Sequence, residues 1–332
     1  FDGIKRVLWE GGARVPAIAY WPGNIKGGQV IVTPTGTWDW LPTFATLAGL
    51  PAPARSDGIS LAPLLTGRGS LAPRAALYFE YAVNGRTPDY ADFEAGRRNR
   101  QRGQMQALRV GNLAAVRYDI QSANDDFEIY DVVNDPKETR NLAADPRFAG
   151  KQAEFKALAL RSRRPDPEAP RPYDAELVPA LTGAEDKGQA GLSYAYFEGD
   201  FPWVPAFATM KARARGTTDR LSVSELKLAP RSGVLFTGYL RVPADGDYTF
   251  TLRTDTGAVL RLHEATVIDA DYGYRPGSAV TATIRLQAGL HPLRLAYRTR
   301  DGASPLLDLQ WSTPGRPPQP IPTSALSHAG SR

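Results

Sequence analysis

Cysteine is absent from the 332 residues, while histidine and methionine are scarce, with three and two. A chain without cysteine forms no disulfide, no thiolate metal site and no cysteine nucleophile of its own. His263, His291 and His328 lie far apart in the sequence, so a zinc site is not expected. No apolar run is long enough to span a bilayer. These absences exclude thiol chemistry within the chain and leave its compartment open.

Length and charge limit the number of domains and the kinds of partner. A chain of 332 residues is expected to contain about two domains. The net charge is +5, but basic and acidic residues are well mixed, so a nucleic-acid partner is not expected. The chain begins at Phe1, without a methionine or a signal-peptide pattern, and we therefore expect a fragment of a longer protein.

The beginning of the chain contains its most distinctive stretch. Residues 15–21 form a short apolar run between a Gly-Gly pair and a Pro-Gly pair, which predicts a buried strand. Lys5 and Arg14 lie on either side of the first glycine pair, where two cations could hold an anion. In the alternative interpretation, Lys5 is a solvated surface residue and Arg14 has a structural role.

This stretch resembles a segment of the sulfatase family, within the alkaline-phosphatase-like superfamily, of the form G-x-K-R-x-L-Y/W-E-G-G-x-R-V-P-x-I-x-x-W-P-G. The matching residues are Gly3, Lys5, Arg6, Leu8, Trp9, Glu10, Gly11, Gly12, Arg14, Val15, Pro16, Ile18, Trp21, Pro22 and Gly23. In that family, the lysine aligned with Lys5 contacts the substrate sulfate. An ammonium suits this role because it can hold the anion and offset charge that grows on the leaving oxygen. The resemblance implies a sulfate contact for Lys5, whereas Arg14 keeps its structural interpretation.

Two helices are predicted in the same half of the chain. The first begins near Asp39, a possible cap, and its apolar residues Leu41, Phe44 and Leu47 have helical spacing, which predicts one buried face. The second covers residues 151–163 with Phe155 and Leu158 inward. The first helix also resembles the sulfatase helix that follows the Trp-Pro-Gly strand.

The resemblance to sulfatases continues along the chain through residues 57–67, 77–81, 106–117 and 129–143. Residues 106–117 also have the pattern of two short strands. Leu113 and Ala114 stand where that family usually has Trp-Lys, so any substrate contact by that lysine is absent here. The acidic residues at 134–138 are expected to form a turn and a cap rather than a catalytic group.

Residues 84–103 are polar and contain an arginine-rich run. We expect a solvated loop. In the alternative, the loop is a basic rim that recognises a sulfated or carboxylated glycan, with Arg98 and Arg100 as candidate substrate contacts.

The second half of the chain has a different composition. A proline-rich, charged run begins at residue 164 and is typical of a semi-rigid linker or a surface strap. We therefore divide the chain into a first module at 1–163, a linker at 164–190 and a β-rich domain at 191–328. Residues 234–252 predict a hairpin at an Asp-Gly turn, and the regular strand spacing predicts a β-sandwich or barrel.

Four short sequences of the β-rich domain are G-L-S-Y-A-Y-F at 191–197, F-T-G-Y-L at 236–240, G-D-Y-T-F at 246–250 and A-G-L-H-P-L-R-L at 288–295. They resemble sequences of the protective-antigen domain family, whose fold is a β-sandwich. In its binding members, two adjacent aspartates of an S-D-D-G sequence hold calcium, and the calcium holds sugar hydroxyls. Here the corresponding sequence is Thr254-Asp255-Thr256-Gly257, so one aspartate is replaced by threonine. Asp255 is a weak metal candidate on this basis, and a turn residue in the simpler interpretation.

These resemblances imply an incomplete α/β sulfatase portion with a small antiparallel subdomain, followed by an all-β sandwich. Sulfatases hydrolyse sulfate esters with a formylglycine made from a C/S-x-P-x-R motif and a calcium ion held by aspartates and an asparagine. We expect that motif and those ligands to be lacking here, so that the chain is catalytically incomplete without a missing N-terminal portion. Its partner would be a sulfated small molecule or glycan, and the parent protein would be periplasmic or secreted. The alternative is a non-catalytic module that binds acidic glycans. The first module alone is expected to expose apolar surface.

Overall fold

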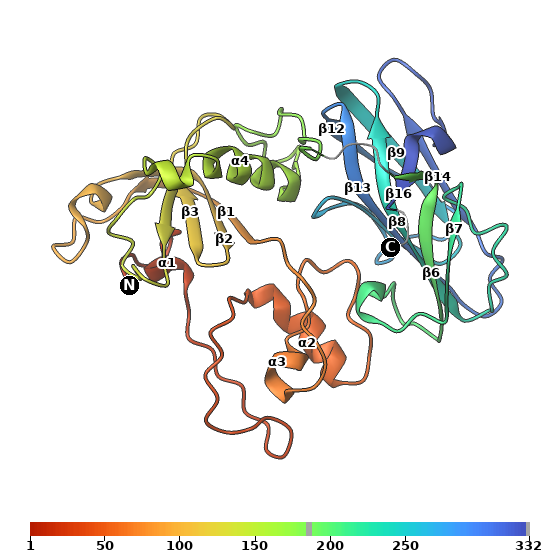
Figure 1. Ribbon diagram of the computed structural model, residues 1–332, viewed down its shortest axis with the longest axis horizontal. Coiled ribbons are helices and arrows are strands. Elements are labelled where there is room, and N and C mark those ends of the chain that lie inside the picture. Colours follow the sequence, from red (N-terminus) through yellow and green to blue (C-terminus); the bar gives the residue numbers. More distant parts are fainter. Residues whose placement is uncertain (184–187, 330–332) are drawn as a thin grey trace. The chain divides into compact units, whose positions relative to one another are not determined.

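The computed structural model describes residues 1–183 and 188–329 of the chain. They form two compact units that are interleaved along the sequence. The first unit consists of Phe1–Gly36 and Pro73–Glu176, and the second of Thr37–Ala72 and Leu177–Arg332. Residues 37–72 thus leave the first unit and belong to the second, as can be followed along the coloured ribbon of Figure 1. In the division of the sequence into consecutive modules, by contrast, residues 37–72 stay with the rest of the first module.

The first unit is built around a four-stranded antiparallel sheet with the strand order β1-β2-β3-β4. Its strands are β1 (Leu77–Arg86), β2 (Gln101–Val110), β3 (Leu113–Arg117) and β4 (Glu128–Asp131). The predicted strand pair at 106–117 is confirmed, because β2 pairs with β3 from Gln106–Arg117 to Val110–Leu113.

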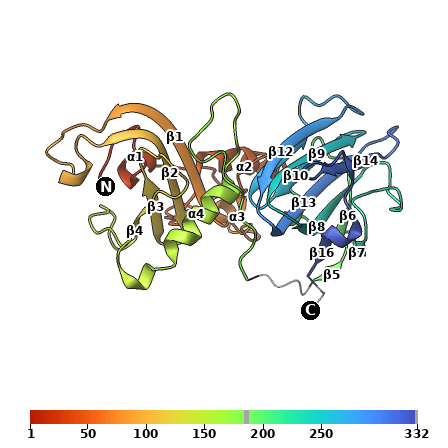
Figure 2. The same ribbon diagram turned by 90° about the horizontal axis from the view of Figure 1, so that it is seen from above.

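Both faces of this sheet are covered, because alternate residues of a strand point to opposite sides. On one face, Leu108 and Ala115 pack with Phe155 of helix α4 (Lys151–Ser162), which lies along the sheet in Figures 1 and 2. On the other face, Ala107 and Val116 pack with Trp9 from the beginning of the chain. The predicted inward position of Phe155 is confirmed, since its side chain is fully buried.

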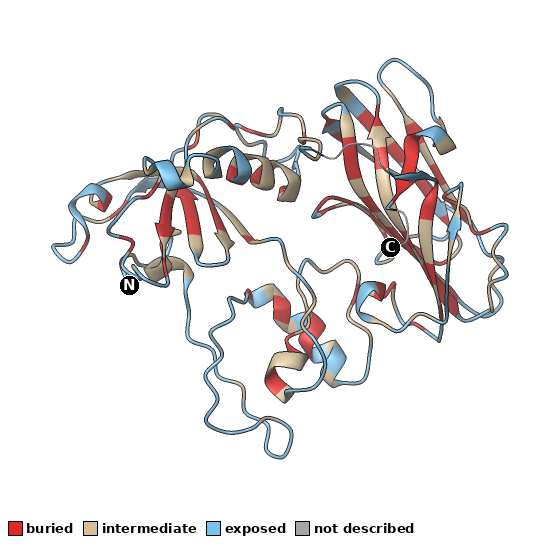
Figure 3. Cartoon of the chain, viewed as in Figure 1, coloured by how far each residue is buried: buried red, intermediate tan, exposed pale blue. Residues whose placement is uncertain are grey.

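The predicted buried strand at 15–21 is wrong. After the short helix α1 (Glu10–Ala13) these residues have no regular secondary structure, and Ile18 and Tyr20 are 92% and 86% exposed. The segment after α1 is exposed along most of its length (Figure 3). A strand needs a neighbour for its backbone groups and a surface for its apolar side chains, and residues 1–183 and 188–329 supply neither for this segment.

The expectation of a solvated loop at 84–103 is confirmed for its mostly exposed middle and corrected at its two ends. Strand β1 extends to Arg86, a 3₁₀ turn covers Ala95–Arg97, and β2 begins at Gln101. The arginine-rich run contains a buried side chain, Arg97, which is 4% exposed. The turn at 134–138 is present, with Glu138 in a left-handed conformation.

The proline-rich run is held against the first unit by Tyr173. This side chain is fully buried, and its hydroxyl donates a hydrogen bond of 2.8 Å to Glu80 Oε2 on β1. Gln104 Nε2 on β2 donates to the same hydroxyl at 2.7 Å. Residues up to Glu176 therefore act as a strap on the first unit, one of the two possibilities that the composition left open.

The second unit begins with a 3₁₀ turn at Thr37–Asp39, helix α2 (Trp40–Leu47) and helix α3 (Ala62–Thr66). The predicted helix is present, but the prediction of its buried face is wrong, because Leu41 and Phe44 are 61% and 60% exposed. The polar side faces inward instead. Buried Asp39 accepts a hydrogen bond from Ile59 N at 2.9 Å, and Thr43 Oγ1 accepts one from Leu61 N at 2.8 Å.

Residues 188–329 form two antiparallel sheets that enclose one apolar core, so the predicted β-sandwich is confirmed. The larger sheet contains β5 (Gln189–Ala190), β6 (Leu192–Glu198), β7 (Ala214–Thr218), β8 (Ser232–Val242), β10 (Gly257–Leu262), β11 (Ala265–Ala270), β13 (Gly289–Thr299) and β16 (Leu326–His328). The smaller sheet contains β12 (Val280–Leu286), β9 (Gly246–Thr254), β14 (Leu307–Ser312) and β15 (Gln319–Pro320).

The predicted hairpin at 234–252 is wrong, although both of its strands exist. β8 pairs with β13, β6 and β16, whereas β9 pairs with β12 and β14. Phe236 and Leu240 of β8 face the same core as Phe250 of β9. The connection at Asp245-Gly246 therefore crosses from one sheet to the other, because both strands bury an apolar face against each other.

Among the described residues, no helix is both long and apolar enough to cross a membrane.

Candidate functional site

Lys5 lies in an exposed turn of the first unit, between two anchored pieces of chain. Val7 N donates to Ile4 O at 3.3 Å across the turn. The chain then returns so closely that a Cβ on Gly11 would lie 2.3 Å from Asp2 O. Glycine is required there because the backbones of the two segments are in contact, as Gly11 N donates to Asp2 O at 2.9 Å. The predicted tight glycine turn beside Lys5 is therefore present.

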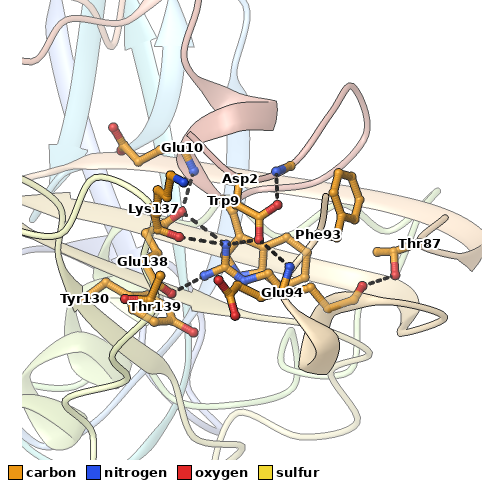
Figure 4. A network of polar contacts seen from close by, with 12 residues as sticks. Asp2, Trp9, Glu10, Thr87, Phe93, Glu94, Tyr130, Lys137, Glu138 and Thr139 are labelled. Atoms are coloured by element: carbon orange, nitrogen blue, oxygen red, sulfur yellow. Dashed lines mark hydrogen bonds and ion pairs between the residues drawn. The ribbon is translucent and has the colours of Figure 1, made fainter. Parts of the chain in front are cut away.

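Asp2 anchors the turn on its N-terminal side. Its carboxylate is 7% exposed and accepts hydrogen bonds from Gly3 N at 2.9 Å, Glu94 N at 3.1 Å and Arg97 Nη1 at 3.0 Å (Figure 4). The Arg97 guanidinium also donates to the carbonyl oxygens of Lys137 and Glu138. One buried arginine thus joins the beginning of the chain to the 134–138 turn.

Trp9 anchors the turn on its C-terminal side. Its ring is fully buried, is stacked on Tyr118 with centroids 4.4 Å apart, and lies under the Arg97 guanidinium at 4.6 Å. Tyr118 also accepts a hydrogen bond from Leu8 N at 2.7 Å through its hydroxyl. Burial raises the pKa of Tyr118, so this phenol stays neutral at ordinary pH. The packing fixes the chain on both sides of Lys5 while its ammonium is exposed.

Glu138 is the second carboxylate near Arg97. Its side chain is fully buried, and Oε2 accepts a hydrogen bond from Glu10 N at 2.9 Å and lies 3.9 Å from Arg97 Nη1. Asp2 is closer to the same guanidinium, at 3.0 Å. Burial raises the pKa of Glu138 to about 7, although the hydrogen bond from Glu10 and the charge of Arg97 oppose this shift. Glu138 was expected only as a turn residue, and the structure gives it a buried ionisable position as well.

Arg98 and Arg100 are both held by neighbouring groups of the first unit. Arg98 folds back on its own loop and donates to Phe93 O at 2.8 Å and Ala91 O at 2.5 Å. Arg100 pairs with Glu128 and lies over the ring of Tyr118 at 4.6 Å. Their assignment as substrate contacts stays a prediction, and this geometry gives both guanidinium groups a structural role.

Asp255 is enclosed by hydrogen bonds within the sandwich. Oδ1 accepts from the Tyr297 hydroxyl at 2.7 Å and Leu306 N at 2.9 Å. Oδ2 accepts from Thr256 Oγ1 at 2.8 Å and Thr299 Oγ1 at 3.2 Å. Both oxygens are used, and the parts of the chain at 1–183 and 188–329 contain no group of three or more His, Cys, Asp or Glu that could hold a metal ion. The assignment of Asp255 as a metal ligand stays a prediction, and this geometry gives its carboxylate a structural role.

Two buried histidines that lie far apart in the sequence meet in the sandwich. His263 Nε2 and His291 Nδ1 are 2.8 Å apart, and His291 Nε2 is 2.8 Å from Gln287 O. Because a carbonyl can only accept, His291 Nε2 donates to Gln287 O, and Nδ1 of the neutral ring accepts the hydrogen bond that His263 Nε2 donates. The two rings thus form a buried hydrogen-bonded pair within the sandwich.

The expectation that the chain contains no C/S-x-P-x-R sequence is wrong. Ser312-Thr313-Pro314-Gly315-Arg316 has that spacing. It lies in the sandwich, where Ser312 ends β14 opposite Thr249 and the next residues form a turn with Arg316 N bonded to Thr313 O at 2.9 Å. Five residues with this spacing arise readily by chance, and the sheet and turn account for them here.

Sequence patterns missed the residues that hold the Lys5 turn, Asp2, Arg97 and Glu138. Arg97 belongs to a run with three other arginines, and nothing in that run distinguishes the buried one. A weak signal was Asp2 itself, a carboxylate immediately before the matched stretch.

Comparison with known proteins agrees with the two architectures. Residues 1–164 match the family described as N-sulphoglucosamine sulphohydrolase, C-terminal, and residues 188–324 match the PA14 domain family. Arylsulfatase A of Homo sapiens is 34% identical over 157 residues, which are 42% of this chain and 28% of that protein. N-acetylglucosamine-6-O-sulfatase of Bacteroides thetaiotaomicron is 28% identical over 164 residues, 48% of this chain and 26% of that protein. The chain thus spans about a quarter of the length of these relatives.

Solved structures similar to the chain include a PA14 sugar-binding domain from an RTX adhesin. It is 17% identical, with a TM-score of 0.37, over 42% of this chain and 99% of that one. The epithelial adhesin 6 A domain of Candida glabrata, in complex with Galb1-3GlcNAc, is 16% identical with a TM-score of 0.38, over 46% of this chain and 93% of that one.

The chain therefore combines a small α/β region with a β-sandwich. More specifically, residues 1–164 match the C-terminal region of the sulfatase family, and residues 188–324 match the PA14 domain, the protective-antigen type expected from the sequence.

Proposed function

We propose that this chain is the C-terminal part of a sulfatase that hydrolyses sulfate esters of glycans or of aryl alcohols, and that Lys5 contacts the sulfate. The exposed Lys5 turn, anchored by Asp2 on one side and Trp9 on the other, supports this proposal best. A fixed turn holds its ammonium near one place, which suits an anion that must be gripped in a defined position. We further propose that the parent protein is periplasmic or secreted.

Lys5 would contribute charge rather than proton transfer. Its ammonium offers three donors to sulfate oxygens and offsets negative charge on the ester oxygen as the S–O bond breaks. In the parent sulfatase, a formylglycine would supply the nucleophile, and a calcium ion would supply a further positive charge. We expect the residues that hold this calcium to be lacking from the chain, and we therefore expect no turnover of an aryl sulfate by the isolated chain.

The test uses the complete sulfatase that carries this chain as its C-terminal part. Lys5→Ala should lower kcat/KM for an aryl sulfate by about 10²- to 10³-fold, as expected for the loss of one charged transition-state contact. Lys26→Ala is the matched control, because Lys26 is another exposed lysine of the N-terminal segment. Both variants should keep wild-type stability, since each removes an exposed side chain.

Two results would contradict this proposal. One is an equal effect of the two lysine substitutions on kcat/KM. The other is hydrolysis of an aryl sulfate by the purified chain with no companion polypeptide present, which would require a nucleophile within these 332 residues.

A second candidate function is carbohydrate binding by the β-sandwich, supported by the PA14 match at 188–324. Because Asp255 accepts four hydrogen bonds within the domain, we expect any such binding to be independent of calcium. A glycan array with and without a calcium chelator tests this. Binding that disappears with the chelator would show that the Asp255 loop opens to hold the ion.

A further inference from the structure

Residues 51–57 lie within the sulfatase match but fold against the β-sandwich. We call them the docked segment. The surface that receives them consists of β10, β11 and the loop at 201–207, and we call it the docking face. Three kinds of contact join the docked segment to the docking face. They are backbone hydrogen bonds, packing in an apolar cluster, and two ion pairs.

The backbone contacts are those of an antiparallel strand pair. Ala54 N donates to Val204 O at 2.8 Å, and Ala206 N donates to Ala52 O at 2.7 Å. Pro53 and Pro205 face each other between these two bonds. At such a position neither residue needs an N–H for the ladder, so two buried prolines fit without losing a donor.

Apolar packing and one indole hydrogen bond add to this ladder. Ala54 packs against a buried cluster of the docking face that includes Phe201, Val204 and Val259. Trp203 Nε1 donates to Pro51 O at 2.9 Å, at the beginning of the docked segment. A side chain larger than alanine at position 54 would have to displace this cluster.

Two ion pairs join the docked segment to the docking face, and the arginine belongs to the face in one pair and to the segment in the other. Arg261 on β10 donates to Ala54 O at 3.0 Å, Ser56 O at 2.9 Å and Asp57 Oδ1 at 3.1 Å. In return, Arg55 of the docked segment pairs with Asp269 on β11 at 2.9 Å. The planar guanidinium of Arg261 has several donors in a fixed arrangement and bonds these three oxygens at once, whereas a lysine ammonium lacks this planar arrangement. Only 15% of the Arg261 side chain is exposed, so water competes weakly for these bonds.

We propose that the docking face is a binding site for an extended, proline-containing segment followed by a carboxylate, and that it fastens the PA14 domain to the sulfatase part by gripping residues 51–57. Arg261 sets the specificity of this site. The domain is therefore attached to the sulfatase part at a second place besides the covalent connection after residue 163. This inference concerns the attachment of the domain and does not depend on sulfatase activity.

The residues that directly follow the docked segment are hydrogen-bonded to helix α2 and to the turn before it. Ile59 N, two residues after Asp57, donates to Asp39, and Leu61 N donates to Thr43 of α2. Gly58 lies so close to the turn before α2 that a Cβ there would be 2.2 Å from Trp38 O. Docking of the segment thus fixes α2 and α3 to the sandwich.

Trypsin cleavage after Arg55 in the full chain measures release of the docked segment, because the bond becomes accessible only when the segment leaves the docking face. Arg261→Ala should raise the rate of this cleavage about tenfold or more, since several charge-assisted hydrogen bonds are lost. Arg261→Lys should give an intermediate rate. Asp57→Asn should give a smaller rise, because Asp57 is 54% exposed. Arg285→Ala is the control, since Arg285 pairs with Asp247 elsewhere on the sandwich at 3.0 Å, and its rate should stay within about twofold of wild type.

Hydrogen exchange decides whether an effect is local. The Ala54 and Ala206 amides should be protected in the wild type and lose protection together in Arg261→Ala, while the β8 and β13 amides keep theirs. Unprotected Ala54 in the wild type, or equal cleavage after Arg55 in wild type and Arg261→Ala, would overturn the proposal. If Arg261→Ala loses the β8 protection as well, the same comparison is made with Asp57→Asn, where an unchanged rate would likewise overturn it.

Discussion

Replacing Glu138 by glutamine should change how the stability of the first unit depends on pH. Burial raises the pKa of Glu138 from 4.5 to about 7 in the folded protein. The folded state therefore binds the proton more tightly than the unfolded state. The contribution of this proton to the free energy of unfolding is complete below about pH 4.5 and is lost as pH rises through 7. This pKa difference corresponds to about 3 kcal/mol between the two ends of the range. The conversion needs no correction for exposure because the side chain is fully buried.

Glutamine keeps the shape of the protonated acid but does not ionise. The free energy of unfolding of Glu138→Gln, relative to that of wild type, should therefore increase by about 3 kcal/mol between pH 4 and pH 8, because only wild type loses stability over this range. Hydrogen exchange of the Ala115 and Val116 amides reports this locally, because β3 lies in the centre of the first unit. Other groups titrate alike in both proteins, so their contributions cancel in the difference.

This reasoning is refuted if the free energies of unfolding of Glu138→Gln and wild type differ by the same amount at every pH from 4 to 8. It would mean that Glu138 is ionised in the folded protein throughout, with Arg97 and the Glu10 amide outweighing its burial. Glu154→Gln is the control, since Glu154 lies on α4 with a side chain that is 48% exposed. Its free energy of unfolding should differ from that of wild type by no more than about 0.5 kcal/mol at pH 4 and at pH 8.

Three further predictions concern packing. Trp9→Ala should destabilise the first unit by about 3–5 kcal/mol in denaturant unfolding, because a fully buried ring is removed from the sheet face, and a loss below about 1 kcal/mol would contradict the packing. Tyr173→Phe should release the strap, seen as faster hydrogen exchange of the Asp174 and Glu176 amides, because the hydroxyl bonds to Glu80 and Gln104 are lost, and unchanged exchange would show that the strap is held elsewhere. Ile18→Gln together with Tyr20→Gln should reduce self-association in light scattering, since both side chains of this segment are exposed, whereas unchanged association would place the contact on another surface.

Much of the local structure could be predicted because its signals are short-range. The alternation at 106–117 predicted the β2–β3 pair, the spacing of Phe155 predicted α4, and the β-sandwich followed from evenly spaced strands. The stretch around Lys5 also carried the resemblance to sulfatases, which the family match confirms. Each of these depends on residues close together in the chain.

The errors arose where distant partners decide the outcome. Residues 15–21 have the composition of a strand, but a strand exists only where another lies beside it. The strands at 234–252 were identified correctly, but their pairing depends on β13 and β12, which come later in the chain. The buried face of α2 was reversed because residues 58–62 pack against its polar side.

The sequence by itself thus determined several of the strands and helices and the two family resemblances, because periodicity and motifs are local properties of the chain. Tertiary structure alone selected Arg97 from its neighbours as the buried anchor of the Lys5 turn, and brought His263 to His291. It also placed residues 51–57 on the sandwich. The physical reason is the same in each case: burial and pairing depend on groups that the chain brings together from far apart, and no local pattern records which groups will meet.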